Sequence, residues 1–433
     1  MIQFNFLLLA FLVLFLLQSG TQFYLHWLNL AHLRQYGTTV PAVFQGTVDQ
    51  ETLKKISSYT IDSDHFHMRA SLIHQSLYLI VLLSGFLPWL MKTIQSWGAG
   101  LILEGLMFFA ILSLLATLSR IPFGLYDTFV IEDRYGFNRM TLRMWISDLL
   151  KSVMIQFLLG GLILWLLLAL VVHGGEAWWV WAWMLVGCFE LMVLWLYPVV
   201  IAPLFNKFEP IQNLGLVEQI RDLMKRVGLR VKAVLKMDAG KRSKHTNAYF
   251  TGIGKTKRIV LFDTLLESHP EEEILAVLAH EVGHWKKRHV LKQIILLEAL
   301  SFAIFYVVSK LLKWPLLYRT FGFEEPTVYV GIFLIGAILS PLGYFAQPLE
   351  SAISRRFERE ADDFVLELTK TAEPMCRALK RLASDNLANL IPHPLYAWFY
   401  YSHPPLVERI ERLSVQEKMM GRLGDREIKR KTR

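Results

Sequence analysis

The chain has 433 residues, 54% of them hydrophobic, and a formal net charge of +9 at pH 7. An apolar fraction this high is too large for an ordinary soluble protein. The positive charge requires no nucleic-acid partner, because most of it lies in segments expected at one face of a membrane. The only two cysteines, Cys188 and Cys376, have no metal-type spacing and are not expected to form a disulfide.

Seven long runs of apolar residues predict an all-α polytopic membrane protein. Each run approaches the ~20 residues that a helix needs to cross ~30 Å of hydrocarbon. The first run is interpreted as a span rather than a signal peptide, since "MIQFN" before it carries no basic residue. The runs cover residues 4–25, 72–91, 101–118, 153–172, 177–200, 294–312 and 328–345.

The basic residues between these runs predict the orientation in the membrane. They gather in the connections after the first and third runs, whereas the connections after the second, fourth and sixth runs carry few. The positive-inside rule then places the N-terminus outside and the C-terminus in the cytoplasm. The basic C-terminal "REIKRKTR" suits an anionic lipid surface. The two basic connections contain Arg34, Lys54, Lys55 and Arg69, and Arg120, Arg134, Arg139, Arg143 and Lys151.

The chain divides into two parts. Residues 1–200 form a transmembrane domain of five spans, and residues 201–433 contain a soluble segment, two further spans and a polar tail. Within the soluble segment, "NLGLVEQIRDLMKRVGL" has helical periodicity, and "VKAVLKMDA" and "RIVLFDTLL" are typical of short strands. "PEEEILAVLAHEVGHWKKRH" (270–289) is expected to be one helix, with acidic residues at its start and basic residues at its end.

The last of these segments contains a candidate metal site. His280 and His284 are four residues apart, so on a helix both imidazoles lie on one face and can bind one ion. Glu281 lies close enough to act on a metal-bound water without binding the metal. A chance occurrence of this H-E-x-x-H pattern is the competing interpretation, and it is the weaker one because a buried histidine pair without a ligand is costly.

A catalytic zinc usually takes three protein ligands. An extended H-E-x-x-H-x-x-G-x-x-H pattern would put the third at residue 290, which is Val290, and His289 is expected to point to the opposite face of the helix. The best candidate is Glu358 in "SRRFEREADDFVLEL" (354–368), with Asp362 one turn later to hydrogen-bond a zinc-bound imidazole. The alternative is a solvated, charged helix face.

Both motifs adjoin apolar runs, so the site is expected at the cytoplasmic surface of the membrane. Five other segments of the chain add to them: "TNAYFTG" (246–252), "RIVLFDTLL", "YSHPPLVERI" (401–410), "EDRYGFN" (132–138) and "PLFNKF" (203–208). Together with "HEVGH" and "SRRFEREAD", these segments resemble the CAAX prenyl protease type 1 family, the a-factor-converting membrane metalloendopeptidases. The resemblance covers nearly the whole chain.

The resemblance implies seven spans around a water-filled chamber, with a gluzincin-type zinc protease domain that contains a small β-sheet. It implies one Zn²⁺ per chain, held by His280, His284 and Glu358, with Glu281 as general base. His403 and Arg409 match positions near the zinc, where they could stabilise an oxyanion. Alternatively, His403 only opens a helix and Arg409 is a structural ion-pair partner.

The resemblance also implies a substrate-binding edge strand formed by Asn247, Ala248, Tyr249 and Phe250, to which an extended peptide would add by backbone hydrogen bonds. A plain edge strand is the alternative. The expected partners are a peptide or protein substrate, which could carry a lipid, and membrane lipids. The expected location is the inner membrane of a bacterium, or the endoplasmic reticulum membrane of a eukaryote.

Three functions follow from these observations. The first is an integral-membrane zinc endopeptidase that resembles enzymes cleaving after a prenylated cysteine. The second is a quality-control protease like the HtpX group, although such chains have fewer predicted spans. The third is a transporter or channel with a structural zinc site, which would have closed four-ligand coordination.

Overall fold

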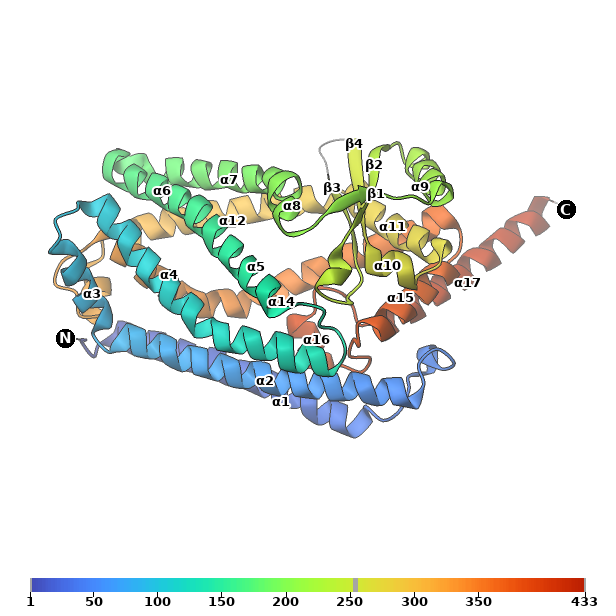
Figure 1. Cartoon of the computed structure of the whole chain (residues 1–433), viewed down its shortest axis with the longest axis horizontal. Helices are drawn as coiled ribbons and strands as arrows, with labels where there is room; N and C mark the ends of the chain where they lie inside the picture. Colours follow the sequence, from blue (N-terminus) through green and yellow to red (C-terminus); the bar gives the residue numbers. More distant parts are fainter. Residues whose placement is uncertain (1, 252–255, 432–433) are drawn as a thin grey trace.

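A computed structural model of the chain describes residues 2–251 and 256–431. Long helices run side by side along the molecule, and a small β-sheet lies at one end (Figure 1). The N-terminus lies at the end opposite the sheet, whereas the C-terminal helix lies at the sheet end. This arrangement fits an odd number of membrane crossings.

Six helical segments in the described part of the chain are long and apolar enough to span a membrane, and a bent helix pair makes a seventh. The pair, α2 (Gln50–Leu83) and α3 (Phe86–Gln95), bends by 56°. The bend falls at Gly85, whose φ of 83° favours glycine. The other spans are α1 (Phe6–Tyr36), α4 with its π-helical end (Leu101–Glu132), α5 with α6 (Leu142–His173), α7 with α8 (Gly175–Phe205), α12 (His289–Leu311) and α14 (Val328–Thr369).

The seven predicted runs correspond to these segments, which confirms the polytopic helical fold. Most helices extend beyond the apolar run that predicted them. The clearest case is α14, whose 42 residues contain both the seventh apolar run and the motif around Glu358. One continuous helix therefore joins the seventh candidate span to the candidate site.

The sheet contains four strands in the order β1-β2-β4-β3. Strands β2 and β4 are parallel, and the two outer pairings are antiparallel. The two strands predicted from the sequence are β2 and β4, and β3 forms one edge, as the family resemblance implied. The strands are β1 (Phe208–Pro210), β2 (Arg230–Met237), β3 (Ala248–Thr251) and β4 (Thr256–Phe262).

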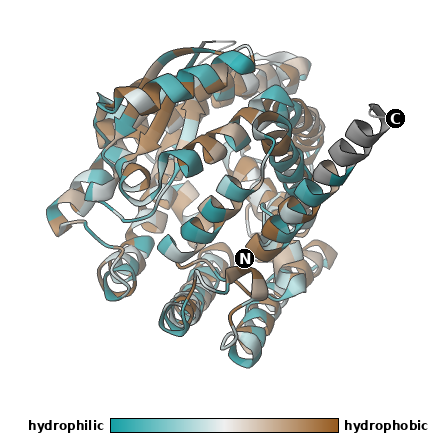
Figure 2. Ribbon diagram, turned by 90° about the vertical axis from the view of Figure 1, so that its right-hand side faces the viewer, coloured by the Kyte–Doolittle hydropathy of each residue, from teal (hydrophilic) through white to brown (hydrophobic). Residues whose placement is uncertain are grey.

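Helices pack around this sheet and bury one apolar core with it. Ile259 and Leu261 of β4 are fully buried in the same cluster as Ile220 of α9 (Leu214–Arg226) and Ile274 of α11 (Glu271–Lys286). Figure 2 shows hydrophobic and hydrophilic residues mixed along the helices at this end of the molecule. The remaining helices are α10 (Asp263–Ser268), α13 (Pro315–Thr320), α15 (Glu373–Asp385), α16 (Pro394–Tyr400) and α17 (Leu406–Lys431).

The expected single helix over 270–289 is shorter in the structure. It begins after Pro270, carries three glutamates in its first turn and ends at Lys286. Arg288 then adopts a left-handed conformation with a φ of 56°, and α12 begins at His289. The chain therefore changes direction between the metal-binding motif and the sixth span.

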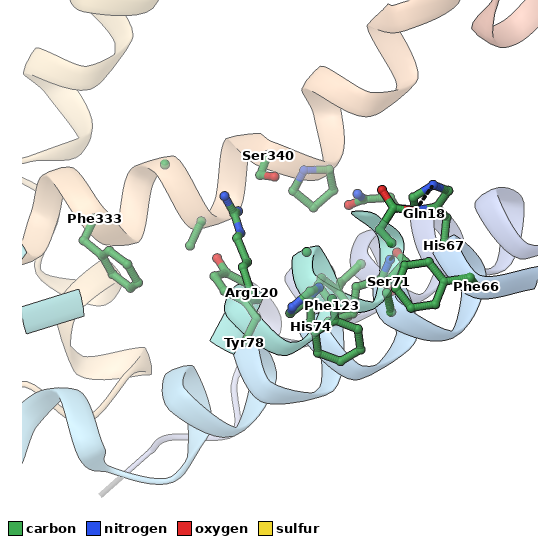
Figure 3. A pocket seen from close by; sticks show the side chains of 18 of the residues that line it. Gln18, Phe66, His67, Ser71, His74, Tyr78, Arg120, Phe123, Phe333 and Ser340 are labelled. Atoms are coloured by element: carbon green, nitrogen blue, oxygen red, sulfur yellow. Dashed lines mark hydrogen bonds and ion pairs between the residues drawn. The ribbon is translucent and has the colours of Figure 1, made fainter. Parts of the chain in front are cut away.

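A cavity of about 950 Å³ lies between α1, α2, α4 and α14. Figure 3 shows Phe333 and Ser340 of α14 facing Arg120 and His74 across this space. The sequence interpretation assigned Arg120 to a cytoplasmic connection, but the structure places it within α4 and on the wall of the cavity. Ser340 is 18 residues before Glu358 on α14, so the cavity lies about 27 Å along the helix from that residue.

Candidate metal centre

Helix α11 presents the two histidines of the first motif toward α14. The Nε2 atoms of His280 and His284 lie 3.2 Å apart. His280 is buried, and the side chain of His284 is 23% exposed. Two imidazole nitrogens therefore converge on one point, as their spacing on a helix predicts.

Gly283, between the two histidines, allows α11 and α14 to approach closely. A Cβ atom at this position would lie 2.9 Å from the Cα of Ala361 and 3.1 Å from its carbonyl oxygen. Because both neighbours are backbone atoms, a larger residue would have to push the helices apart. The glycine therefore helps to set the distance between the histidines and the carboxylates of α14.

Glu358 on α14 completes a group of three ligand atoms. Its Oε2 lies 3.2 Å from Nε2 of His280, and its Oε1 lies 3.2 Å from Nε2 of His284. Zinc bonds of 2.0–2.1 Å at tetrahedral angles would separate ligand atoms by about 3.3 Å. The geometry and the donor set of two imidazoles and one carboxylate therefore fit a zinc ion.

The environment of Glu358 also fits a cation. Its Oε2 is buried and makes no hydrogen bond of acceptable geometry with any described residue, although Nδ1 of His403 lies only 2.7 Å away. A buried carboxylate oxygen without a hydrogen-bond donor is unfavourable unless a cation neutralises it. A metal ion at the meeting point of the three ligand atoms would remove this cost.

Asp362 lies one turn after Glu358 and contacts the imidazole of His280 at its other ring nitrogen. Its Oδ1 lies 2.9 Å from Nδ1 of His280. Burial lowers the pKa of His280, but its contacts with the carboxylates of Asp362 and Glu358 outweigh burial and raise the pKa to about 9. Asp362 and Glu358 therefore face opposite nitrogens of the His280 ring.

Arg409 of α17 closes this part of the site. Its Nε and Nη2 lie 2.9 and 2.7 Å from the two carboxylate oxygens of Asp362, and both side chains are buried. Its Nη1 lies 3.8 Å from Oε2 of Glu358. Arg409 therefore forms a structural ion pair with Asp362, as one of its two expected roles required, and it also lies close to Glu358.

His403 lies in the connection between α16 and α17. Its side chain is 62% exposed, which leaves it accessible from solvent beside Glu358. Buried Arg355 of α14 donates hydrogen bonds to the carbonyls of Trp398 and Tyr401 at the end of α16. Arg355 therefore anchors the connection that carries His403, a role that sequence reasoning missed.

The second imidazole has a different partner, which overturns one expectation. His289 was expected to point away from the motif, but its Nδ1 lies 3.0 Å from Nδ1 of His284. The expectation assumed one continuous helix, and the break at Arg288 makes that assumption wrong. The sequence signal for this contact is a third histidine close to the motif, and sequence reasoning considered that histidine only as a metal ligand.

Glu281 is mostly buried beside the two candidate ligand histidines. Burial raises the pKa of its carboxyl group, and the nearby His280 opposes that rise. Within the described residues it makes no hydrogen bond or ion pair. A carboxylate that is neither a ligand nor engaged elsewhere is available to accept a proton.

The four residues expected at the substrate edge lie at the start of the outer strand. Ala248, Tyr249 and Phe250 belong to β3, which pairs with β4 on one side only, and Asn247 immediately precedes it. The carbonyl of Asn247 accepts a hydrogen bond from the amide of Phe262. Strand β3 also contacts α11, the helix that carries the two histidines.

Comparison with known proteins identifies the family of the chain. A family model described as "CAAX prenyl protease N-terminal, five membrane helices" matches residues 29–207, and a model of peptidase family M48 matches residues 210–417. A CAAX prenyl protease 1 homolog of Arabidopsis thaliana is 35% identical over 88% of this chain and 91% of its own length. CAAX prenyl protease 1 of Saccharomyces cerevisiae is 33% identical over 88% and 90%.

A solved structure shows the same fold. The crystal structure of S. mikatae Ste24p matches with a TM-score of 0.89 and 31% sequence identity, and the match covers 95% of this chain and 99% of that one. Both halves of the chain are included in these matches. The chain therefore belongs to peptidase family M48, within the CAAX prenyl protease type 1 group of multi-span membrane zinc metalloproteases.

Proposed function

We propose that each chain binds one zinc ion through Nε2 of His280, Nε2 of His284 and the carboxylate of Glu358. The observation that carries this proposal is the geometry of the three side chains: the two Nε2 atoms lie 3.2 Å apart, and each lies 3.2 Å from one oxygen of the Glu358 carboxylate. A zinc ion held there would act as a Lewis acid and lower the pKa of a water molecule. The three protein ligands leave room for that water, in contrast to a closed structural site.

Glu281 is the proposed general base. It adjoins His280 on α11, is not part of the ligand group and has no hydrogen-bond partner among the described side chains. It would accept the proton of the attacking water and later deliver it to the leaving amine. Burial favours this role, because proton transfer to a desolvated carboxylate is easier than to a hydrated one.

Asp362, Arg409 and His403 have supporting roles in this proposal. Asp362 holds the Nδ1 proton of His280, and Arg409 holds Asp362 by two hydrogen bonds. His403 is exposed and lies 2.7 Å from Glu358, so its imidazole can donate to the oxyanion that develops on the substrate carbonyl. Arg409 contributes positive charge to the same region.

The proposed substrate is an extended peptide that adds to the free edge of β3 at Asn247–Phe250. Pairing with a sheet edge supplies affinity from backbone groups and requires little sequence specificity. The relatives are named as CAAX prenyl proteases. We therefore propose a protein substrate with a prenylated C-terminal cysteine, cleaved on the C-terminal side of that residue.

The proposed topology has the N-terminus outside and the C-terminus in the cytoplasm, with the catalytic end at the cytoplasmic face. The basic connections and the termini at opposite ends of the helices support it. The proposed boundary between the two domains at about residue 200 is supported by family models that meet between residues 207 and 210. For the host membrane, a bacterial inner membrane and the endoplasmic reticulum remain the two proposals.

The test is Glu281→Gln in the purified full-length protein, with a farnesylated CAAX peptide as substrate. Loss of a general base should lower turnover by about 10²- to 10⁴-fold while zinc content stays unchanged. Glu272→Gln, an exposed acidic residue in the first turn of the same helix, is the matched control and should retain activity. Unchanged turnover in Glu281→Gln would refute the base assignment.

The substrate proposal needs its own comparison. A farnesylated peptide, its unprenylated twin and an unfolded membrane protein should be offered to the same preparation, with and without a chelator. We expect chelator-sensitive cleavage of the farnesylated peptide above the other two. Preference for the unfolded protein would instead favour the quality-control alternative.

A further inference from the structure

The two candidate ligand histidines are both tied to α14, but by different routes. Asp362 contacts His280 directly, at 2.9 Å. Among the described residues of α14, Glu358 is the only acidic one in direct contact with His284. The Nδ1 atom of His284 instead faces Nδ1 of His289 at 3.0 Å, and Nε2 of His289 faces Oε2 of Glu360 at 3.1 Å.

Helix geometry explains why Glu360 can reach His284 only through an intermediate residue. Asp362 follows Glu358 by four residues and so lies on nearly the same face of α14. Glu360 follows Glu358 by two residues and is rotated by about 200° around the helix. Its carboxylate therefore cannot reach His284, and His289 at the start of α12 bridges the gap.

Only one direction of hydrogen bonding fits this chain of contacts. An ionised carboxylate can only accept, so Nε2 of His289 must donate to Glu360. Nδ1 of a neutral His289 then carries the lone pair and accepts from Nδ1–H of His284. Nε2 of His284 is left with its lone pair directed at Glu358, which is the tautomer that a metal ligand requires.

Packing, basic side chains and the backbone together fix the positions of His289 and Glu360. The side chain of His289 is 2% exposed and stacks on Phe357 of α14, with ring centroids 4.3 Å apart and planes within 9°. Glu360 is oriented by Nε of Arg356 at 3.1 Å, with Nζ of Lys292 at 3.8 Å. The left-handed Arg288 turns the chain so that His289 faces the motif.

We propose that His289 and Glu360 are positioning residues for the second zinc ligand, holding His284 in the metal-binding tautomer and orientation. Partners of this kind change metal affinity about 10- to 100-fold when they are removed. The inference rests on the zinc site proposed above. It adds that the site is held by two separate hydrogen-bond routes, through Asp362 and through His289.

The test compares two substitutions that separate hydrogen bonding from packing. His289→Phe keeps the stacked ring on Phe357 but removes both hydrogen bonds. His289→Gln loses the stacking, but its amide oxygen can accept from His284 and its amide nitrogen can donate to Glu360. Zinc affinity is measured on the purified full-length protein by equilibrium competition with a chelator, without reference to proteolysis.

We expect His289→Phe to lower zinc affinity about 10- to 100-fold and His289→Gln to retain most of it. Wild-type affinity in His289→Phe would overturn the inference, as would equal losses in the two variants. The wild-type protein and His284→Ala are measured beside them. If those two bind zinc equally, the proposed zinc site itself fails, and the two failures are thereby distinguished.

Because His289 is buried and its variants could fail to fold, Glu360 provides a second test at a partly exposed position. Glu360→Leu removes the acceptor at the end of the route and should also weaken zinc binding. Glu367→Leu is the matched control on the same helix, since Glu367 is 60% exposed and pairs with Lys287 at the surface. An unchanged affinity in Glu360→Leu, or an equal loss in Glu367→Leu, would contradict the role of Glu360.

Discussion

The two halves of α14 provide polar surroundings of opposite kinds. In the half after Arg355, Glu358 and Asp362 are buried together with His280 and Arg409, and each of the four lies within hydrogen-bond distance of another. In the half before Pro341, the helix lines a cavity of about 950 Å³. The side chain of Arg120, which lines that cavity, makes no hydrogen bond or ion pair with any described residue.

The difference indicates how each region tolerates change. In the candidate metal centre, removal of one group leaves a buried partner unsatisfied, which is costly. In the cavity, water or a bound molecule can solvate a polar group, so substitution changes the lining with little effect elsewhere. The first region is therefore expected to be sensitive to single substitutions and the second to be tolerant.

The largest effect is expected from Glu358→Gln. The substitution keeps the side-chain size but removes the only candidate ligand that carries a negative charge. Zinc affinity should fall by more than about a hundredfold, which exceeds the loss expected when a hydrogen-bond partner of a ligand is removed. Proteolysis should fall to background. Metal analysis after dialysis measures the loss, and full retention of zinc would place the third ligand elsewhere.

Asp362→Asn should have the next largest effect. It leaves the buried guanidinium of Arg409 without its ionised partner and weakens the hydrogen bond to Nδ1 of His280. We expect zinc affinity to fall about 10- to 100-fold in a chelator competition. The neighbouring Asp363→Asn weakens only partly exposed contacts with Arg412 and Gln416, away from the candidate ligands, and is expected to bind zinc like the wild type.

Gly283→Ala tests the close approach of α11 and α14. The added methyl would meet backbone atoms of Ala361, and overpacking of this kind costs about 1–3 kcal/mol. The thermal unfolding midpoint and the zinc affinity should both decrease. Gly343→Ala on α14 is the control, because its Cβ would meet no described atom within 4 Å, and it should be neutral or stabilising.

Arg120→Gln tests whether the cavity beside the first half of α14 tolerates a substitution. Because Arg120 faces the cavity without a partner among the described residues, the free energy of unfolding should change by less than about 0.5 kcal/mol. Zinc affinity should not change, since the cavity lies about 27 Å along α14 from Glu358. A loss of zinc affinity in this variant would show that the two halves of α14 are coupled.

The smallest effect concerns His245, which joins the sheet end to the π-helical end of α4. Its hydrogen bond with Glu132 raises the pKa of the imidazole above its ordinary value. The folded state then binds more protons than the unfolded state around that pKa. The stabilising contribution is complete below pH ~6.5 and is lost as the pH rises through the raised pKa.

Thermal unfolding of the wild type and of His245→Asn across this pH range measures the contribution. The fall in stability with rising pH should be shallower in the variant. The effect should be small because the side chain of His245 is 41% exposed and solvent screens the interaction. Identical pH profiles would exclude His245 as a source of pH-dependent stability.

Local patterns in the sequence determined much of this structure. The length of an apolar run decides whether a helix can cross a membrane, and all seven runs correspond to spanning segments. A spacing of four residues decides which side chains share a helical face, so the pairs His280–His284 and Glu358–Asp362 could be assigned from spacing alone. The family resemblance identified the outer strand and the enzyme class, and the comparisons confirm the class.

Tertiary structure decided what local periodicity cannot describe. The position of His289 depends on a left-handed residue at 288, and a helical-wheel argument carried across that break gives the wrong face. Gly283 and Arg120 likewise acquire their environments from α14, a segment more than forty residues away from either in the chain. Periodicity predicts which side chains share a face, but long-range packing determines which face another helix covers and which remains open to a cavity.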